Sequence, residues 1–484
     1  MAEENNIPTP TTHKDESKKQ PREDGALLAS LYGMTPKVEV AVINAIADGK
    51  TERVQALVAP LHPADQADLL ERLNKVQRFR LYRMLGSSLD TETLTFLHED
   101  MLDEALSIIG TEEVARALPE LDSDDAVDIL EELEQEELDN ILAALPVAER
   151  IFVEESLSFP EDSAGRMMQR EVVVAPSHWT VGQVIDFMRN QSDLPDDFYS
   201  IFIIDPARRV IGQVMLSQVL ISQRPKRLSE LMENTPHQIP VTMDQEEVAL
   251  LFVRYGLLST AVVDDQGRIV GMITVDDIVD VIEEEAEEDI MALGQVSDMN
   301  IRSSLLDTLK ARFSWLMINL GTAVIASVVI GMFDETIEKL VALAVLMPIV
   351  ASMGGNAGTQ TVTVAVRAIA MRQLSPQTVR GFVAREVSVG LLNGVIFAVT
   401  CGAVSWLWFG NPEIALVMAA AMLFNLVVAG LSGAMIPLTL ERIGVDPAVA
   451  SSVFITTVTD VIGFLSFLGP VSYTHLRAHE TPLH

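Results

Sequence analysis

The pattern of apolar and polar positions divides the chain into two contrasting parts. After Arg312, apolar residues run on for the length that a helix needs to cross a bilayer. Five such runs are predicted as membrane-spanning helices, at about 313–333, 340–370, 387–409, 413–440 and 447–468. Before Arg312, polar residues break the apolar positions into short elements. We therefore expect a large water-exposed part followed by an all-α, five-helix transmembrane domain.

Between residues 26 and 160, apolar positions recur at helical spacing, and few segments alternate as strands do. We expect an all-α superhelical domain there. Asp124 and Asp128 lie four residues apart in one predicted helix, so their carboxylates share a face. Such a pair can contribute to a cation site, although a solvated polar face explains it as well.

An internal repeat of about 60 residues begins near residue 162. The first copy predicts a strand at 171–175, a helix at 180–188, strands at 201–204 and 210–215, and a helix near 217. The second predicts a strand at 237–241, a helix at 245–255, strands at 261–264 and 269–273, and a helix from 275. Two such α/β units resemble a tandem pair of CBS domains.

The CBS resemblance implies a regulatory pair that often binds ATP or another adenine nucleotide. In the second copy, Gly271 to Asp277 matches that family's ribose-contacting Gly-x-x-Thr-x-x-Asp pattern through Thr274 and Asp277. The first copy has Met215 and Gln218 at the corresponding positions. The resemblance therefore implies a nucleotide at the second copy rather than the first.

Charge sharpens this picture. Residues 1–312 hold 27 of the 34 basic and 60 of the 69 acidic residues, and so carry −33 of the net charge of −35. Such a field repels nucleic acid and concentrates cations, so no nucleic-acid partner is expected. The single Cys401 excludes a disulfide framework and a cysteine-based zinc site. Residues 1–25 are polar and lack the apolar stretch of a signal peptide, so we expect disorder there and a cytoplasmic location for the part that follows.

The most acidic stretch is 275–289, in which nine of fifteen residues are Asp or Glu. No basic residue lies between Arg268 and Arg302. Carboxylates at helical spacing repel one another unless a cation or a basic partner offsets them. The stretch is therefore either a solvated linker or a sensor of a divalent cation, because carboxylate oxygens are preferred ligands of Mg2+.

Polar residues inside two predicted spans are candidates for an ion path. In the second span we expect Gly354, Gly355 and Gly358 to loosen the helix and free carbonyl groups, with the amides of Asn356 and Gln360 on one face. Helix packing through small residues is the alternative, but it explains only the glycines.

The fifth span carries Asp460, preceded by Thr456 and Ser452 at one and two helical turns. Hydroxyl groups leading to a carboxylate suit a hydrated cation. The alternative is a protonated Asp460 hydrogen-bonded between helices. Basic residues before the first span and in the second and fourth connections predict a cytoplasmic N-terminus and an outside C-terminus.

The chain has a helical domain, a CBS pair, an acidic connecting helix and five spans, in that order. This order, together with Gly-Gly-Asn-Ala-Gly-Thr-Gln at 354–360 and Thr-Thr-Val-Thr-Asp at 456–460, resembles the MgtE family of Mg2+ channels. The resemblance implies a homodimer in the lipid bilayer of the inner membrane, with its pore on the two-fold axis. It also implies a connecting "plug" helix that closes the pore when cytosolic Mg2+ is plentiful. A CBS-regulated secondary transporter for Mn2+ or Co2+, or a cation exchanger, is the alternative. No enzyme is expected, because the spans lack a catalytic constellation.

The resemblance also assigns roles to individual residues. It makes Asp460 the pore carboxylate, lines the path with Asn356 and Thr456, and puts Asp446 at the cytoplasmic mouth. The implied Mg2+ sensor residues are Asp244, Glu246, Asp277, Asp280, Glu285, Glu288 and Asp289. Gly256 replaces a residue that is often acidic in the family, and Thr456 stands where some members have Ala.

These inferences define the expected domains. They are a disordered segment 1–25, a helical domain 26–160, CBS domains 161–226 and 227–289, a long connecting helix 290–312, a membrane domain 313–469, and an atypical, foreign-looking tail 470–484.

Overall fold

The computed structural model describes residues 34–131, 133, 135–191, 194–195, 198–233, 236–296 and 305–480. The chain forms two compact units, Met1–Val281 and Ile282–His484. The expected disorder of residues 1–25 lies outside the described residues, as do residues 297–304 of the expected connecting helix.

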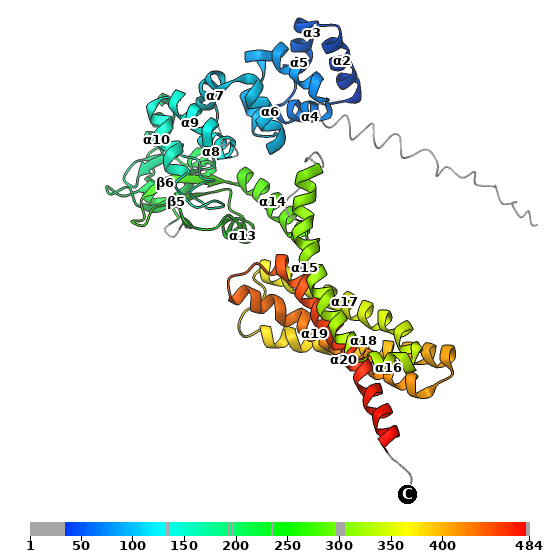
Figure 1. Cartoon of the computed structure of the whole chain (residues 1–484). Coiled ribbons are helices and arrows are strands. Elements are labelled where there is room, and N and C mark those ends of the chain that lie inside the picture. The colour runs from blue at the N-terminus through cyan, green and yellow to red at the C-terminus, as the bar shows by residue number, and fades with distance from the viewer. Residues whose placement is uncertain are drawn as a thin grey trace, which may run out of the picture. The chain divides into compact units, whose positions relative to one another are not determined.

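The first unit begins with short amphipathic helices around one core (Figure 1). Fully buried Leu69, Leu70 and Leu81 show why apolar residues at helical spacing fold this way. Asn74 and Gln77 form a reciprocal capping box that starts one helix. The α-helices are α2 (Pro36–Ala47), α3 (Thr51–Val58), α4 (Pro63–Arg72), α5 (Lys75–Leu85), α6 (Glu99–Ile109), α7 (Thr111–Ala117), α8 (Ser123–Glu131), α9 (Gln135–Ala144) and α10 (Val147–Ser156). Short 3-10 turns are η1 (Gly86–Ser88), η2 (Thr91–Leu94) and η3 (Leu118–Glu120).

Two three-stranded sheets follow, and they confirm the predicted repeat. The first copy contains β1 (Val174–Pro176), α11 (Val181–Asn190), β2 (Ser200–Ile204), β3 (Val210–Met215), α12 (Leu216–Ile221) and the turn η4 (Leu228–Glu230). The second contains β4 (Gln238–Pro240), α13 (Gln245–Tyr255), β5 (Ser259–Val263), β6 (Ile269–Thr274) and α14 (Val275–Leu293). In each copy the first strand runs parallel to the second and the second antiparallel to the third.

The two copies pack together through their sheets. Phe202 of β2 shares a buried cluster with Ala261 and Met272 of the second copy. The helical domain is joined to this pair by polar contacts within the same unit. Arg166 pairs with Glu131 of α8 at 2.7 Å. These contacts anchor α8 beside the repeat.

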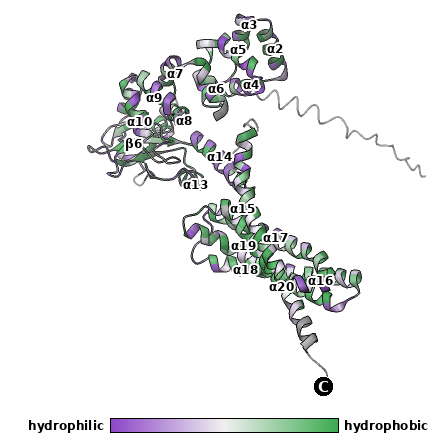
Figure 2. Ribbon diagram, in the orientation of Figure 1, coloured by the Kyte–Doolittle hydropathy of each residue, from purple (hydrophilic) through white to green (hydrophobic). Residues whose placement is uncertain are grey.

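The second unit holds the membrane helices α15 (Leu305–Gly331), α17 (Val341–Ala370), α18 (Val379–Phe409), α19 (Pro412–Arg442) and α20 (Pro447–Glu480), with the short α16 (Asp334–Lys339). Among the described residues, five helices are long and apolar enough to cross a membrane, as the pattern predicted. Hydrophobic residues dominate them (Figure 2). Helix α19 packs against α17, α18 and α20, while α15 packs along α20.

Two expectations about these helices are wrong. Helix α17 is continuous through Gly354, Gly355 and Gly358 rather than loosened. Two of these glycines instead permit close packing, Gly354 against Asn425 and Gly358 against Ile455. The connection between the first and second spans contains the short helix α16.

The second wrong expectation is the single connecting helix over 290–312. Helix α14 ends at Leu293, and Gln295 adopts a left-handed φ of 57°. The Val296 amide then donates to the Met291 carbonyl at 3.0 Å, which is a Schellman-type ending. At the other end of the unit, α20 passes through Pro470 to Glu480, beyond the predicted end of the fifth span.

Candidate functional site

The first turn of α14 and the first turn of α8 hold three carboxylates whose charges interact within the first unit. Asp277 accepts hydrogen bonds from the Thr274 amide at 3.1 Å and the Thr274 hydroxyl at 2.9 Å. Asp124 accepts one from the amide of Asp125 at 3.1 Å. Asp124 is only 6% exposed, which is rare for a carboxylate. We call Asp124, Asp125 and Asp277 the α8–α14 cluster.

Burial and mutual repulsion raise the pKa of every member of this cluster. Burial raises the pKa of Asp124 well above its usual range, and the nearby Asp277 adds to the effect. Burial also raises the pKa of Asp125 to about 7, with Asp122 and Asp277 contributing. The pKa of Asp277 rises to about 6 through burial, although its hydrogen bonds from Thr274 oppose the rise. The charged groups that raise these pKa values are all carboxylates, so a cation would relieve the repulsion.

Two other sets of predicted residues lie beside this cluster. Asp128, predicted to act with Asp124, is exposed on α8, and its charge adds to the rise in the pKa of Asp124. Thr274 and Asp277, the predicted ribose contacts, are hydrogen-bonded to each other. Asp277 is therefore shared between the predicted nucleotide site and the α8–α14 cluster.

The predicted sensor residues on α13 have a local structural role. Asp244 caps α13 by accepting a hydrogen bond from the Glu246 amide at 3.0 Å. Both residues are exposed. At the other end of the helix, Gly256 has a left-handed φ of 63° and ends the helix. An acidic residue at this position would be strained, which gives a physical reason for the glycine.

The last turns of α14, which belong to the second unit, also carry acidic residues. Glu285 and Asp289 are half-buried, while Asp280 and Glu288 are exposed. Burial raises the pKa of Asp289, and the carboxylate of Asp446 raises it further.

Asp446 has a second role, because its Oδ1 caps α20 by accepting a hydrogen bond from the Ala448 amide at 2.7 Å. The carboxylates of Asp289 and Asp446 therefore repel each other. No pattern in the sequence pairs these two residues.

Sequence reasoning missed the contacts that hold the end of α14. Ala292 is buried in a cluster with Val362, Val366, Ala448 and Ile455. Just beyond it, the Gln295 side chain donates to the Ser452 hydroxyl at 2.9 Å and accepts from the Asn319 amide. Asn319 is a polar residue inside an apolar run, and that signal alone could have drawn attention to it. We call Gln295, Ser452 and Asn319 the amide latch.

The predicted path residues occupy two helices of the second unit. Asp460 on α20 is half-buried, and Thr456 is exposed, with its hydroxyl donating to the Ser452 carbonyl at 2.9 Å. On α17, Asn356 and Gln360 are exposed, whereas Gly354 and Gly358 are buried between helices. The predicted polar residues of α17 thus face outward from a single chain.

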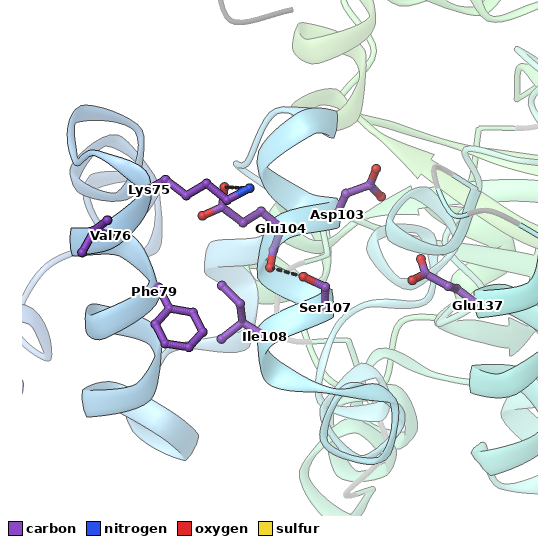
Figure 3. A pocket seen from close by; sticks show the side chains of 8 residues that line it. All are labelled: Lys75, Val76, Phe79, Asp103, Glu104, Ser107, Ile108 and Glu137. Atoms are coloured by element: carbon purple, nitrogen blue, oxygen red, sulfur yellow. Dashed lines mark hydrogen bonds and ion pairs between the residues drawn. The ribbon is translucent and has the colours of Figure 1, made fainter. Parts of the chain in front are cut away.

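A pocket of about 830 Å³ lies elsewhere, in the helical domain (Figure 3). Phe79 and Ile108 form its apolar wall, and Lys75 lies 4.0 Å from Glu104 at its rim. None of the predicted site residues lines it. Across the described part of the chain, no three His, Cys, Asp or Glu side chains converge closely enough to form a ready-made metal site.

Comparisons with known proteins follow the same division of the chain. Family models match for the "MgtE intracellular N domain" at residues 61–162, the "CBS domain" at 164–223 and 228–284, and the "Divalent cation transporter" MgtE at 347–470. A solved structure titled as the cytosolic domain of the Mg2+ channel MgtE in complex with ATP is 28% identical. It covers 50% of this chain and 99% of its own, with a TM-score of 0.48.

Two full-length relatives are both named magnesium transporter MgtE. The protein of Bacillus subtilis is 28% identical over 431 residues, which cover 88% of this chain and 95% of the relative. The protein of Thermus thermophilus is 34% identical over 454 residues, which cover 90% of this chain and 98% of the relative. These matches confirm the resemblance drawn from the motifs, and the chain belongs to the MgtE family of magnesium transporters.

Proposed function

We propose that this protein lets Mg2+ enter the cytoplasm down its electrochemical gradient and closes when cytosolic Mg2+ binds its acidic sites. Membership of the family and the names of its relatives support the substrate. The observation that carries the regulatory half is the α8–α14 cluster, in which buried carboxylates raise one another's pKa values. Such a cluster is stable only when protonated or bound to a cation.

We assign the path of the conducted ion to polar side chains of two helices. These are Thr456 and Asp460 on α20, and Asn356 and Gln360 on α17. Asp460 attracts the cation, and Thr456, Asn356 and Gln360 offer oxygens that replace few of its waters. A divalent ion gains about 4.6 kcal/mol per 100 mV of inside-negative potential, twice the value for one charge. Entry therefore needs no coupled hydrolysis of ATP.

We further propose a homodimer with the path on its axis. The side chains of Asn356, Gln360 and Thr456 are exposed in the single chain, and a second copy would enclose them away from lipid. Exposed Leu220 and Ile221 on α12 and Val253 on α13 give the water-exposed part its own apolar surface for a partner copy. The membrane is the inner membrane, with the N-terminus in the cytoplasm.

Sensing is proposed at both ends of α14. The donor set of Asp124, Asp125 and Asp277 consists of carboxylate oxygens, which fits a hard cation such as Mg2+. Asp289 and Asp446 form the second site, and the bound ion supplies the positive charge that offsets their repulsion. The remaining predicted sensor residues contribute from α13 and α14: Asp244, Glu246, Asp280, Glu285 and Glu288. Asp128 contributes from α8.

Gating then follows as a population shift, because Mg2+ binds the closed form more tightly than the open one. In the closed form, Ala292 and the amide latch hold the end of α14 on α15, α17 and α20. Loss of Mg2+ leaves repelling carboxylates, and the α14 helix is released. An adenine nucleotide at Thr274 and Asp277 would compete with Mg2+ for Asp277.

The test is uptake of isotopically labelled Mg2+ into proteoliposomes that contain almost no internal Mg2+. Asp460→Ala should lower uptake by about tenfold or more, since it removes the charge that stabilises the cation inside the membrane. Glu413→Gln, which removes an acid from the first turn of α19, is the control and should transport normally. Wild-type uptake in Asp460→Ala would overturn the assignment of the path.

An exchanger is the second candidate, and one observation favours it. Glu386 on α18 is a second carboxylate within a membrane helix, and Thr361 of α17 lies 3.5 Å from it. Such a group could carry a proton against the cation. Mg2+ uptake accompanied by a stoichiometric rise of internal pH, absent in Glu386→Gln, would establish exchange.

A further inference from the structure

Asn425 is a polar residue in the interior of the membrane domain that none of the preceding roles uses. It lies on α19 and has no exposed surface. Its side-chain Nδ2 donates to the Val350 carbonyl of α17 at 2.9 Å. Among the described residues its Oδ1 has no hydrogen-bond partner. A buried amide among apolar helices is costly, so its position needs a reason.

The neighbouring helices leave space for this amide by means of two glycines. A Cβ atom added to Gly354 of α17 would collide with the Asn425 amide nitrogen. A Cβ atom added to Gly463 of α20 would lie 2.9 Å from the same nitrogen. Asn425 therefore lies between α17 and α20, and any larger residue on either side would displace it.

These are the two helices that carry the proposed cation path. Asn356 follows Gly354 by two residues, so it faces the opposite side of α17, about 200° around the helix. Asp460 precedes Gly463 by three residues on α20 and lies about 60° from it. The buried faces of α17 and α20 both pack against the amide group of Asn425. This packing therefore fixes the distance between the side chains of Asn356 and Asp460.

We propose that Asn425 is a positioning residue that sets the spacing of Asn356 and Asp460 and thereby the choice among hydrated divalent cations. The proposal rests on the proposed function, because it assumes that the path runs along these two residues. Mg2+ gives up its waters reluctantly and needs near-ideal octahedral geometry, whereas Ca2+ accepts flexible and larger shells. A path whose width changes should therefore lose discrimination between the two ions before it loses conduction.

The experiment measures initial rates of Mg2+ and Ca2+ uptake into proteoliposomes without internal divalent ions, for the full-length wild type and Asn425→Ala. The ratio of Mg2+ to Ca2+ uptake should fall by about threefold or more in the variant, as expected for one interhelical hydrogen bond in a membrane. Should Asn425→Ala yield no protein, Asn425→Leu is compared with the wild type in the same way. Leu keeps the branching and the number of side-chain heavy atoms but cannot form the hydrogen bond.

Two controls separate positioning from general packing. Ser405→Ala removes another fully buried polar group, on α18, and should leave the ratio unchanged. Gly321→Ala adds a methyl group to a membrane-helix glycine that has open space around it, and should also leave the ratio unchanged.

A double variant tests the hydrogen bond directly. Gly354→Ala alone should lower thermal stability and the uptake ratio, because its methyl group collides with the amide. Gly354→Ala with Asn425→Ala removes the collision and should restore stability but not the ratio. Restoration of both would show a packing role only and overturn the proposal.

An unchanged ratio in Asn425→Ala and Asn425→Leu with normal uptake would also overturn it. If the wild type takes up no Mg2+, the proposed function itself fails, which is a different result from a changed or unchanged ratio.

Discussion

The two ends of α14 carry acidic residues in opposite settings. At its first turn, Asp277 meets Asp124 and Asp125, and burial raises the pKa of all three carboxyl groups. At its last turn, Asp289 meets one acid, Asp446, beside apolar contacts and the amide latch. The first end is held together only if a cation or protons offset its charge, while the second has attractive contacts of its own. We propose that both ends bind the ion, that the first end depends on it more strongly, and that the second also transmits its binding to the membrane helices.

The largest expected effect is a loss of stability at the first end as pH rises in EDTA. Asp277 has a pKa of about 6 in the folded chain against 3.8 for an ordinary Asp. Its protonated form therefore contributes stability below pH 4, and that stability is lost as pH rises through about 6. For a single independent carboxyl group, a rise of this size corresponds to about 3 kcal/mol. Asp125, whose pKa is about 7, extends the pH range of this loss upward.

This stability can be measured by hydrogen exchange of peptides from β5 and β6 in the full-length protein. These peptides report on the second CBS copy and not on the membrane helices. Protection should fall between about pH 4 and pH 7 in EDTA, after correction for intrinsic exchange, and saturating Mg2+ should flatten the profile. A profile that is flat in EDTA would contradict the repulsion at the first end.

The second prediction removes one charge from that end. Asp277→Asn keeps an oxygen that can accept from Thr274 but removes the repulsion, so protection of β5 and β6 at neutral pH in EDTA should rise by about 2 kcal/mol. The further gain on adding Mg2+ should shrink. Asp265→Asn, at an exposed residue outside α8 and α14, is the control and should behave as wild type. An equal rise of protection in the two variants would mean that the net negative charge of the domain, and not the α8–α14 cluster, lowers its stability.

The third prediction concerns the last turn. Asp289→Asn should raise the internal Mg2+ concentration that half-inhibits uptake by about fivefold, since a charge pair at this depth is worth about 1 kcal/mol. Uptake at low internal Mg2+ should not change. Glu287→Gln, at an exposed residue two positions earlier, serves as control. An unchanged half-inhibiting concentration in Asp289→Asn would remove this residue from the sensor.

The smallest effect is expected at the amide latch. Gln295→Gly removes both hydrogen bonds while suiting the left-handed backbone at this residue. Residual uptake at saturating internal Mg2+ should rise by about threefold, and the half-inhibiting concentration should change little. A large shift in that concentration with no change in residual uptake would reverse the roles given to the latch and the acids.

Local patterns predicted the elements that have strong periodicity. Residues 245–255 form α13 as expected, because apolar residues alternate with polar ones at helical spacing. The strands at 201–204 and 210–215 were found from short runs of apolar residues that are rich in β-branched side chains. Helix α5 carries little periodic signal of its own, because Arg78, Arg80 and Arg83 are interspersed among apolar residues that lie all around the helix.

Long-range contacts were not predictable from the sequence. Asp124 and Asp277 were identified separately, but more than 150 residues separate them, and no local rule pairs them. The glycines near Asn356 were read as a weak point in a helix, whereas Gly354 makes room for Asn425, a lone polar residue in another helix. The predicted domain boundaries and the residue-level roles in sensing and conduction stay predictions.

The most direct test of the account is isotopic Mg2+ influx through the wild-type protein, in vesicles whose lumen faces the acidic part, at low and at high internal Mg2+. We expect rapid influx at low internal Mg2+ and strong inhibition at high internal Mg2+, with the inhibition weakened when Asp277 and Asp289 are both replaced by Asn. Influx that is the same at both internal concentrations, with Asp460→Ala still inactive, would leave a Mg2+ path but contradict sensing by α14.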